Sequence, residues 1–137
     1  MNPELKVIIY EQKSILNKML KQLDEQYDVI VNEEAVKIDK IAKELDDTSK
    51  ELAKIEINRR KIMGSDTSMK NTIEKCEDEN IKKAYGEITN TLRMIEIQKE
   101  ANETIVKQKL FFTKKMMNFI KPKSGIGTYN AYGQVGK

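Results

Sequence analysis

Apolar residues recur at steps of three and four along most of this sequence, and no proline interrupts them. The only prolines are Pro3 and Pro122, so the whole stretch between them is free of strong helix breakers. Two series carry the repeat, and their members are Leu5, Ile9, Leu16, Met19, Leu23 and Ile30, then Ile38, Ile41, Leu45, Leu52, Ile55 and Ile62. This period predicts an all-α protein whose long helices pair along a narrow apolar seam. A mean hydropathy of −0.63 with 34% charged residues also favours an elongated coiled coil over a thick core.

The first clear interruption of the repeat is the stretch MGSDTS at residues 63–68. Gly64 suits the end of a helix, and the Asp, Thr and Ser that follow suit the start of the next one. At ~1.5 Å per residue, helices over 4–63 and 68–121 would be about 90 Å and about 81 Å long. Such near-equal arms favour a long antiparallel hairpin over residues 1–121, with its turn near 63–68.

A second break is open at Asn32. Asn can cap the start of a helix, and Glu33 and Glu34 would place carboxylates in its first turn. The same segments would then fold as a three-helix bundle, which packs similar seams. The sequence favours the hairpin and keeps the bundle as the alternative.

Three polar side chains fall at seam positions. Gln12 and Asn102 are expected to fix the register of the paired helices at some expense of stability. Arg59 is expected to cover the seam with its aliphatic stem while the guanidinium reaches water. All three are therefore interpreted as structural.

The composition excludes several function classes. The chain has no histidine and one cysteine, Cys76, so imidazole catalysis, common zinc sites and an internal disulfide are not available. The stretch Gly64-Ser65-Asp66 is not a phosphate loop, and the carboxylates alternate with lysines along helix faces. The sequence predicts no catalytic residue, no metal site and no cofactor. It also predicts a cytoplasmic protein, because there is no signal peptide and no apolar run near the ~18 residues of a membrane span.

Charge is divided unevenly along the chain. Of 25 Lys and Arg and 22 Asp and Glu, residues 104–137 hold seven lysines and no acid, which leaves 18 against 22 upstream. The two parts therefore carry +7 and −4. A basic end of this kind suits an anionic lipid surface, a nucleic acid or an acidic protein. Nucleic acid is disfavoured, because the aromatic residues are phenylalanines in helical phase and no RNA-binding motif accompanies them.

The basic end also holds more apolar surface than one helical seam uses. Residues 104–121 contain all three phenylalanines and form two stripes, Ile105, Phe112, Met116 and Phe119, and Val106, Leu110, Met117 and Ile120. Together they span about half of the helix circumference, against the roughly 100° of a single seam. The surplus stripe is expected to meet another helix of this chain, a second copy, a membrane surface or, as the sharper hypothesis, helices of other proteins.

The end of the chain differs from everything before it. Residues 122–137 hold four of the six glycines and are predicted to form a flexible tail without regular structure. Tyr129 and Tyr132 are unusual in such a tail, since each offers a large contact area and a hydroxyl group.

The tail and two upstream segments resemble one known family. The ending YNAYGQ, residues 129–134, resembles the YGxxGQ-like signature that closes flagellar export chaperones of the FlgN type. The run EINRR at 56–60, followed by Met63 and Gly64, resembles that family's acidic helix with an Arg-Arg turn. The stretch NETIV at 102–106 resembles its Asn-containing segment. The chain departs from the family pattern at Asn130, at Tyr132 and in lacking the second asparagine of that segment.

The resemblance implies a bacterial cytoplasmic chaperone of the flagellar type III export system. Its clients would be the hook-associated proteins at the hook–filament junction, whose terminal helices it would hold, preventing premature assembly, and deliver to the export gate. Carried over residue by residue, the client-binding region falls on Val106, Leu110, Phe112, Met117 and Ile120. Docking to the cytoplasmic domain of the export gate falls on Tyr129, Gly133 and Gln134.

Further partners and two other functions are also considered from the sequence. The export ATPase is a further candidate partner, and a homodimer is left open. Stable membrane insertion is not expected. Two other readings remain beside the chaperone, a structural coiled-coil adaptor or self-associating scaffold, and a module that binds membrane surfaces.

Overall fold

The computed structural model describes residues 1–64 and 68–124, with side chains up to Ile120, and these residues form four helices. They are α1 (Pro3–Val31), α2 (Ala35–Met63), α3 (Met69–Glu74) and α4 (Glu79–Ser124). The all-α prediction is confirmed, and the described residues contain no strand. The chain divides into two compact units, Met1–Asn102 and Glu103–Lys137.

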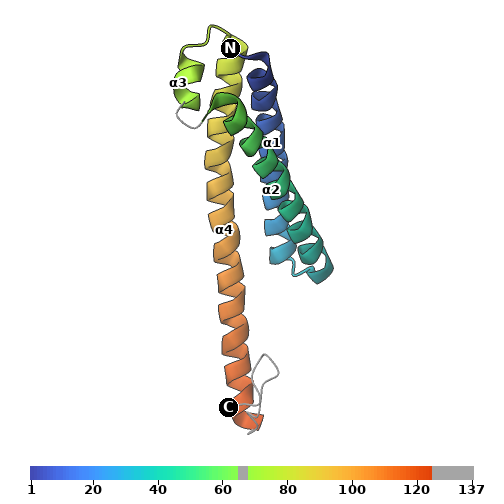
Figure 1. The fold of residues 1–137 in the computed structure, drawn as a ribbon. Helices are drawn as coiled ribbons and strands as arrows, with labels where there is room; N and C mark the ends of the chain where they lie inside the picture. The colour runs from blue at the N-terminus through green and yellow to red at the C-terminus, as the bar shows by residue number, and fades with distance from the viewer. Residues whose placement is uncertain (65–67, 125–137) are drawn as a thin grey trace. The chain divides into compact units, whose positions relative to one another are not determined.

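In the first unit α1 and α2 form an antiparallel hairpin (Figure 1). Side-chain contacts fix the direction, because Gln12 Nε2 donates to Glu56 at 3.2 Å, and further along α1 Lys18 Nζ lies 3.3 Å from Glu51. The uninterrupted helix expected over residues 4–63 is not present. The chain instead breaks between Val31 and Ala35, as the three-helix alternative expected, and the hairpin turn lies at Asn32–Glu34.

The turn between α1 and α2 is closed by backbone hydrogen bonds. The Glu34 N–H donates to the Val29 carbonyl at 3.0 Å, and the Glu33 N–H donates to the Ile30 carbonyl at 3.1 Å. These two bonds form a Schellman motif, which needs a left-handed residue, and Glu33 provides it with φ 55°. Asn32 therefore ends α1, whereas the sequence suggested that it begins the next helix.

The path from α2 to α4 contains a break that the sequence did not predict, at residues 75–78, and this break makes residues 69–74 a separate short helix. Gly64, with φ 82°, follows the last residue of α2, and α3 begins after Ser68, whose hydroxyl accepts a hydrogen bond from the Asn71 N–H at 3.4 Å. The single helix expected over 68–121 is therefore interrupted before Glu79. α4 then continues to Ser124, past Pro122.

Asp78 directly precedes α4, caps its first turn and connects it to α1. Its carboxylate accepts hydrogen bonds from the backbone N–H groups of Asn80 and Ile81 at 3.0 and 3.3 Å, and it lies 2.9 Å from Lys6 Nζ. The hydrogen bond from Lys6 and that from the Ile81 N–H hold the pKa of Asp78 below its usual value. The hydrogen bond between Lys6 and the Asp78 carboxylate also raises the pKa of Lys6.

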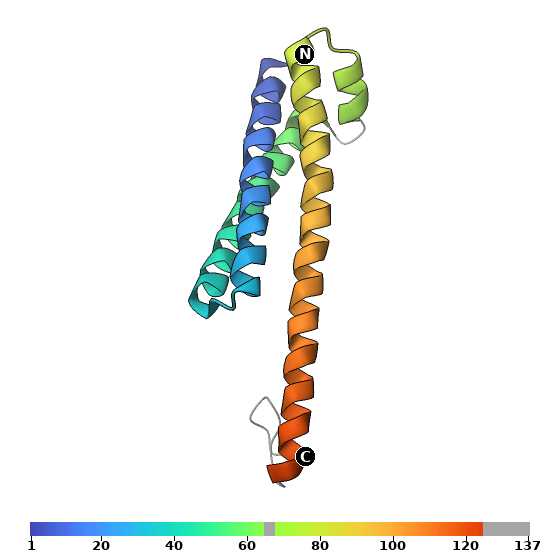
Figure 2. The same cartoon turned by 180° about the vertical axis from the view of Figure 1, so that it is seen from behind.

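In the first unit α4 runs in the same direction as α1 (Figure 2). The ion pair of Lys13 with Glu87 at 3.1 Å follows that of Lys6 with Asp78, and further along the Thr91 hydroxyl donates to Asn17 Oδ1 at 3.3 Å. Three long helical segments thus lie side by side in this unit, with α2 opposite in direction to the other two.

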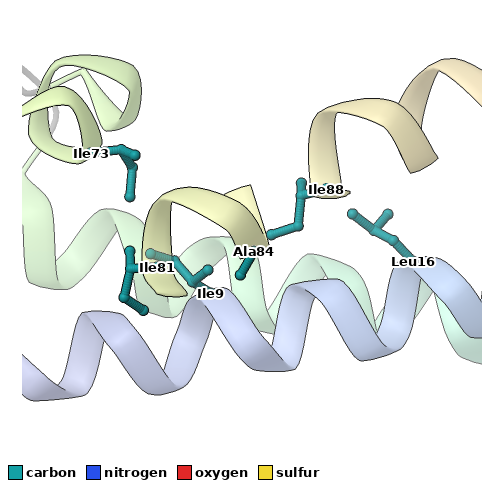
Figure 3. Packing of buried hydrophobic residues seen from close by; sticks show 6 residues of the cluster. All are labelled: Ile9, Leu16, Ile73, Ile81, Ala84 and Ile88. Atoms are coloured by element: carbon teal, nitrogen blue, oxygen red, sulfur yellow. The ribbon is translucent and has the colours of Figure 1, made fainter. Parts of the chain in front are cut away.

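The apolar core of the first unit joins α1, α3 and α4 (Figure 3). Its buried members are Ile9, Leu16, Ile73, Ile81, Ala84 and Ile88, and Leu52 of α2 packs against them. Fully burying one such aliphatic side chain stabilises a fold by about 1.5–3 kcal/mol. α3 thus contributes a core residue, Ile73, despite having six residues.

Candidate helix-binding surface

The described part of the second unit is one helical segment, residues 103–124 of α4. It has no Gly and no acid after Glu103, so its interior holds no glycine that would weaken the helix. Its apolar side chains are largely exposed, with Leu110 at 58% and Phe112 at 64% of their full accessible surface. Exposed residues of this size along one helix are typical of a surface that binds another protein.

The apolar side chains of this segment form two stripes at ~100° per residue. We name them by one member each. The Val106 stripe consists of Val106, Leu110, Met117 and Ile120, and the Phe112 stripe consists of Ile105, Phe112, Met116 and Phe119. Their centres lie about 120° apart around the helix axis. Each stripe is wide enough to pair with one further helix.

Four of the five residues assigned to client binding lie together. Val106, Leu110, Met117 and Ile120 make up one stripe, in which Met117 is half-buried and the other three are exposed. Phe112 is also exposed but belongs to the other stripe. The export-gate residues Tyr129, Gly133 and Gln134 lie outside the described residues.

Phe111 belongs to neither stripe. It is exposed, and the Lys115 ammonium lies 5.5 Å from the centre of its ring, within the range of a cation–π contact. Neither Phe111 nor Lys115 is among the site residues predicted from the sequence. The i, i+4 spacing of Phe and Lys on a helix was the available signal.

Lysines border the Val106 stripe. Lys107 and Lys114 are seven residues apart, both are exposed, and both lie about 80° from the centre of the stripe. At the sequence level these two lysines were counted only in the net charge of the basic end. Their heptad position was the signal that would have placed them beside the stripe.

The first unit carries an apolar groove of its own. Its volume is about 340 Å³, and it is lined by Gln12, Leu16, Ser49, Leu52, Ala53, Glu56, Ile88 and Leu92. Glu56 accepts hydrogen bonds from Gln12 and from Arg59. The Arg59 side chain is 18% exposed and is paired with Glu56 on α2, so its role is structural but its guanidinium is held by a carboxylate where the sequence suggested that it reaches water.

Two kinds of site are not found in the part of the chain that the structure describes. No group of three or more acidic or cysteine side chains there is arranged to hold a metal ion. No helix within residues 1–64 and 68–124 has the length and apolar character to cross a bilayer.

The fold and the exposed stripes define a class of protein, an all-α protein with a helical surface suited to partner helices. The whole sequence, residues 1–137, matches the family model described as FlgN protein. The chain belongs to the FlgN family of flagellar export chaperones, which is not an enzyme family. No curated protein and no solved structure matches the chain.

Proposed function

We propose that this chaperone acts in the cytoplasm and binds the terminal helices of hook-associated proteins of the hook–filament junction. It prevents their premature assembly and delivers them to the type III export gate. The observation that carries the proposal is the exposed Val106 stripe in a chain of the FlgN family. A client helix laid on the stripe would bury residues such as Leu110, each at roughly 1.5–3 kcal/mol before ordering costs.

The tail has a separate task in this proposal. Tyr129, Gly133 and Gln134 dock on the cytoplasmic domain of the export gate while the helical segment holds the client. Support comes from their match to the family's terminal signature. A tail tethered to the client-binding helix raises the local concentration of client at the gate.

Calorimetric titration tests the client site directly. The C-terminal helical segment of a hook-associated protein is titrated into the full chain and into Leu110→Glu. We expect the variant to bind at least about tenfold more weakly, because a charge replaces an apolar contact worth more than about 1.4 kcal/mol. Far-UV circular dichroism should be unchanged, because Leu110 is exposed.

A matched variant controls for the added charge. Ile97 is an exposed aliphatic residue of α4 in the first unit, 63% accessible against 58% for Leu110. We expect Ile97→Glu to bind the client peptide within about twofold of the unaltered chain, since surface changes outside a contact have small effects. Phe112→Glu then tests whether the Phe112 stripe also contacts the client. Equal binding by Leu110→Glu and the unaltered chain would contradict the proposal.

A further inference from the structure

Residues 103–124 have a heptad register that the apolar stripe alone does not reveal. When Val106, Thr113 and Ile120 take the d positions, Leu110 and Met117 fall on the a positions. This is the register of a two-helix seam. Every e position within the segment is then a lysine, namely Lys107, Lys114 and Lys121. Two of the three g positions, 109 and 123, are lysines as well.

Residues at e and g border the seam and face the corresponding edges of a partner helix, so their charges select the partner. Two copies of this segment would place lysines opposite lysines in both orientations. A parallel pair matches e with g, and an antiparallel pair matches e with e. Like charges in these positions are destabilising. The register therefore disfavours pairing of the Val106 stripe with itself.

Lys107 and Lys114 are exposed, and no acidic side chain follows Glu103 in the segment to neutralise them. An apolar stripe bordered by lysine at every e position and at two of three g positions complements an apolar seam with an acidic border. We propose that the partner of the Val106 stripe is an amphipathic helix with Asp or Glu at the positions that border its apolar seam. The inference rests on the proposed function and names the chemical class of helix that this site accepts.

Two synthetic heptad peptides of equal length and identical Leu and Ile seam serve as probes. One carries Glu at every e and g position, and the other carries Lys there. Neither pairs with itself readily, because each repels its own copy. Both are titrated into the full chain by fluorescence anisotropy in about 0.05 M and about 1 M salt, where the Debye length is about 14 Å and about 3 Å.

We expect the Glu peptide to bind at least about tenfold more tightly than the Lys peptide at low salt. The preference should shrink toward equality at high salt, because exposed charges are then screened. Equal binding of the two peptides at low salt would overturn the inference, and so would binding of neither.

Adjacent lysines provide a matched pair of variants. Lys114 borders the Val106 stripe, whereas Lys115 lies on the opposite side of the helix, where it contacts Phe111. Lys114→Glu and Lys115→Glu change the net charge equally. We expect Lys114→Glu to weaken Glu-peptide binding about threefold or more and Lys115→Glu to leave it within about 1.5-fold. Equal effects would mean that net charge alone acts, which contradicts the assigned register.

Failure of the inference can be told apart from failure of the proposed function. If a hook-associated helix binds equally well to the unaltered chain and to Lys114→Glu, the proposed chaperone function stands and the proposal of an acidic border on the partner helix is wrong. If no hook-associated helix binds but the Glu peptide does, the proposed client is wrong and the acidic-helix site stands. Vesicles containing phosphatidylglycerol that displace the Glu peptide would identify a lipid surface as the ligand and overturn the inference.

Discussion

Asn102 is a buried polar residue whose whole amide is engaged. Its side chain is 4% exposed, and its Nδ2 donates to the Leu23 carbonyl at 2.9 Å and to Gln26 Oε1 at 2.8 Å. Its Oδ1 accepts a hydrogen bond from Gln98 at 3.0 Å. The bond to a backbone carbonyl of α1 sets the position of α4 along α1, because a shift of either helix would leave the buried amide unpaired. This geometry agrees with the register role expected from the sequence.

Asn102→Ala should lower the free energy of unfolding by about 1–3 kcal/mol, since it removes these hydrogen bonds and leaves a small cavity. Urea denaturation followed by circular dichroism measures the change. Gln98→Ala is the control, because it removes only the bond to Asn102 Oδ1 from a partly exposed residue, and we expect a loss below about 0.5 kcal/mol. Similar losses for the two variants would show that the hydrogen bonds from Asn102 to α1 add little to the free energy of unfolding.

At the scale of elements, the hairpin turn depends on an unusual residue. Glu33 occupies a left-handed conformation at φ 55°, which costs roughly 1–2 kcal/mol for a residue with a Cβ atom. Glycine adopts this conformation without that cost. The turn between α1 and α2 is therefore stable despite its local sequence, and the packing of the two helices supplies the compensation.

Glu33→Gly should consequently be more stable than Glu33→Ala by about 1 kcal/mol. Both substitutions remove the glutamate side chain and its interactions, so their difference isolates the backbone conformation. Thermal and urea unfolding of the two variants measure it. Equal stability would mean that the turn relaxes out of the left-handed region when the side chain is shortened.

The same turn explains which parts of the fold were predictable. The buried residues of α1, such as Leu5, Ile9 and Leu16, follow the apolar period of the sequence. The break after Val31 was left as an alternative, because neither Gly nor Pro marks it and Glu33 is an uncommon left-handed residue. The break between α3 and α4 was missed because residues 75–78 contain neither Gly nor Pro.

The candidate site was predictable to a similar extent. The surplus of apolar residues after Asn102 was visible in the sequence, because two stripes exceed the needs of one seam. Phe112 was assigned to client binding together with Leu110 by the family resemblance, although its helical phase places it on the other stripe. The role proposed for Lys114 was not predicted, because net charge alone does not distinguish a lysine beside the stripe from one on the opposite side of the helix.

At the scale of the whole molecule, the sequence joins three stretches of different chemistry. Residues 1–102 contain the buried core, residues 103–124 carry exposed apolar stripes and lysines with no acid after Glu103, and residues 129–134 resemble the family's terminal signature. In the proposed function the second stretch holds the client and the tail docks on the gate. Substitutions in residues 103–124 should then leave docking on the gate intact, and substitutions in the tail should leave client binding intact.

Tyr129→Ala tests this division of tasks. We expect it to bind the client peptide within about twofold of the unaltered chain, because Tyr129 is not part of either stripe. Secretion of hook-associated proteins by cells that carry the variant should fall, because the chaperone–client complex no longer reaches a high local concentration at the gate. Leu110→Glu is the reciprocal control, since it should weaken client binding and retain binding to the cytoplasmic domain of the gate. If Tyr129→Ala weakened the client as strongly as Leu110→Glu does, the tail would be part of the client site and the two tasks would share one surface.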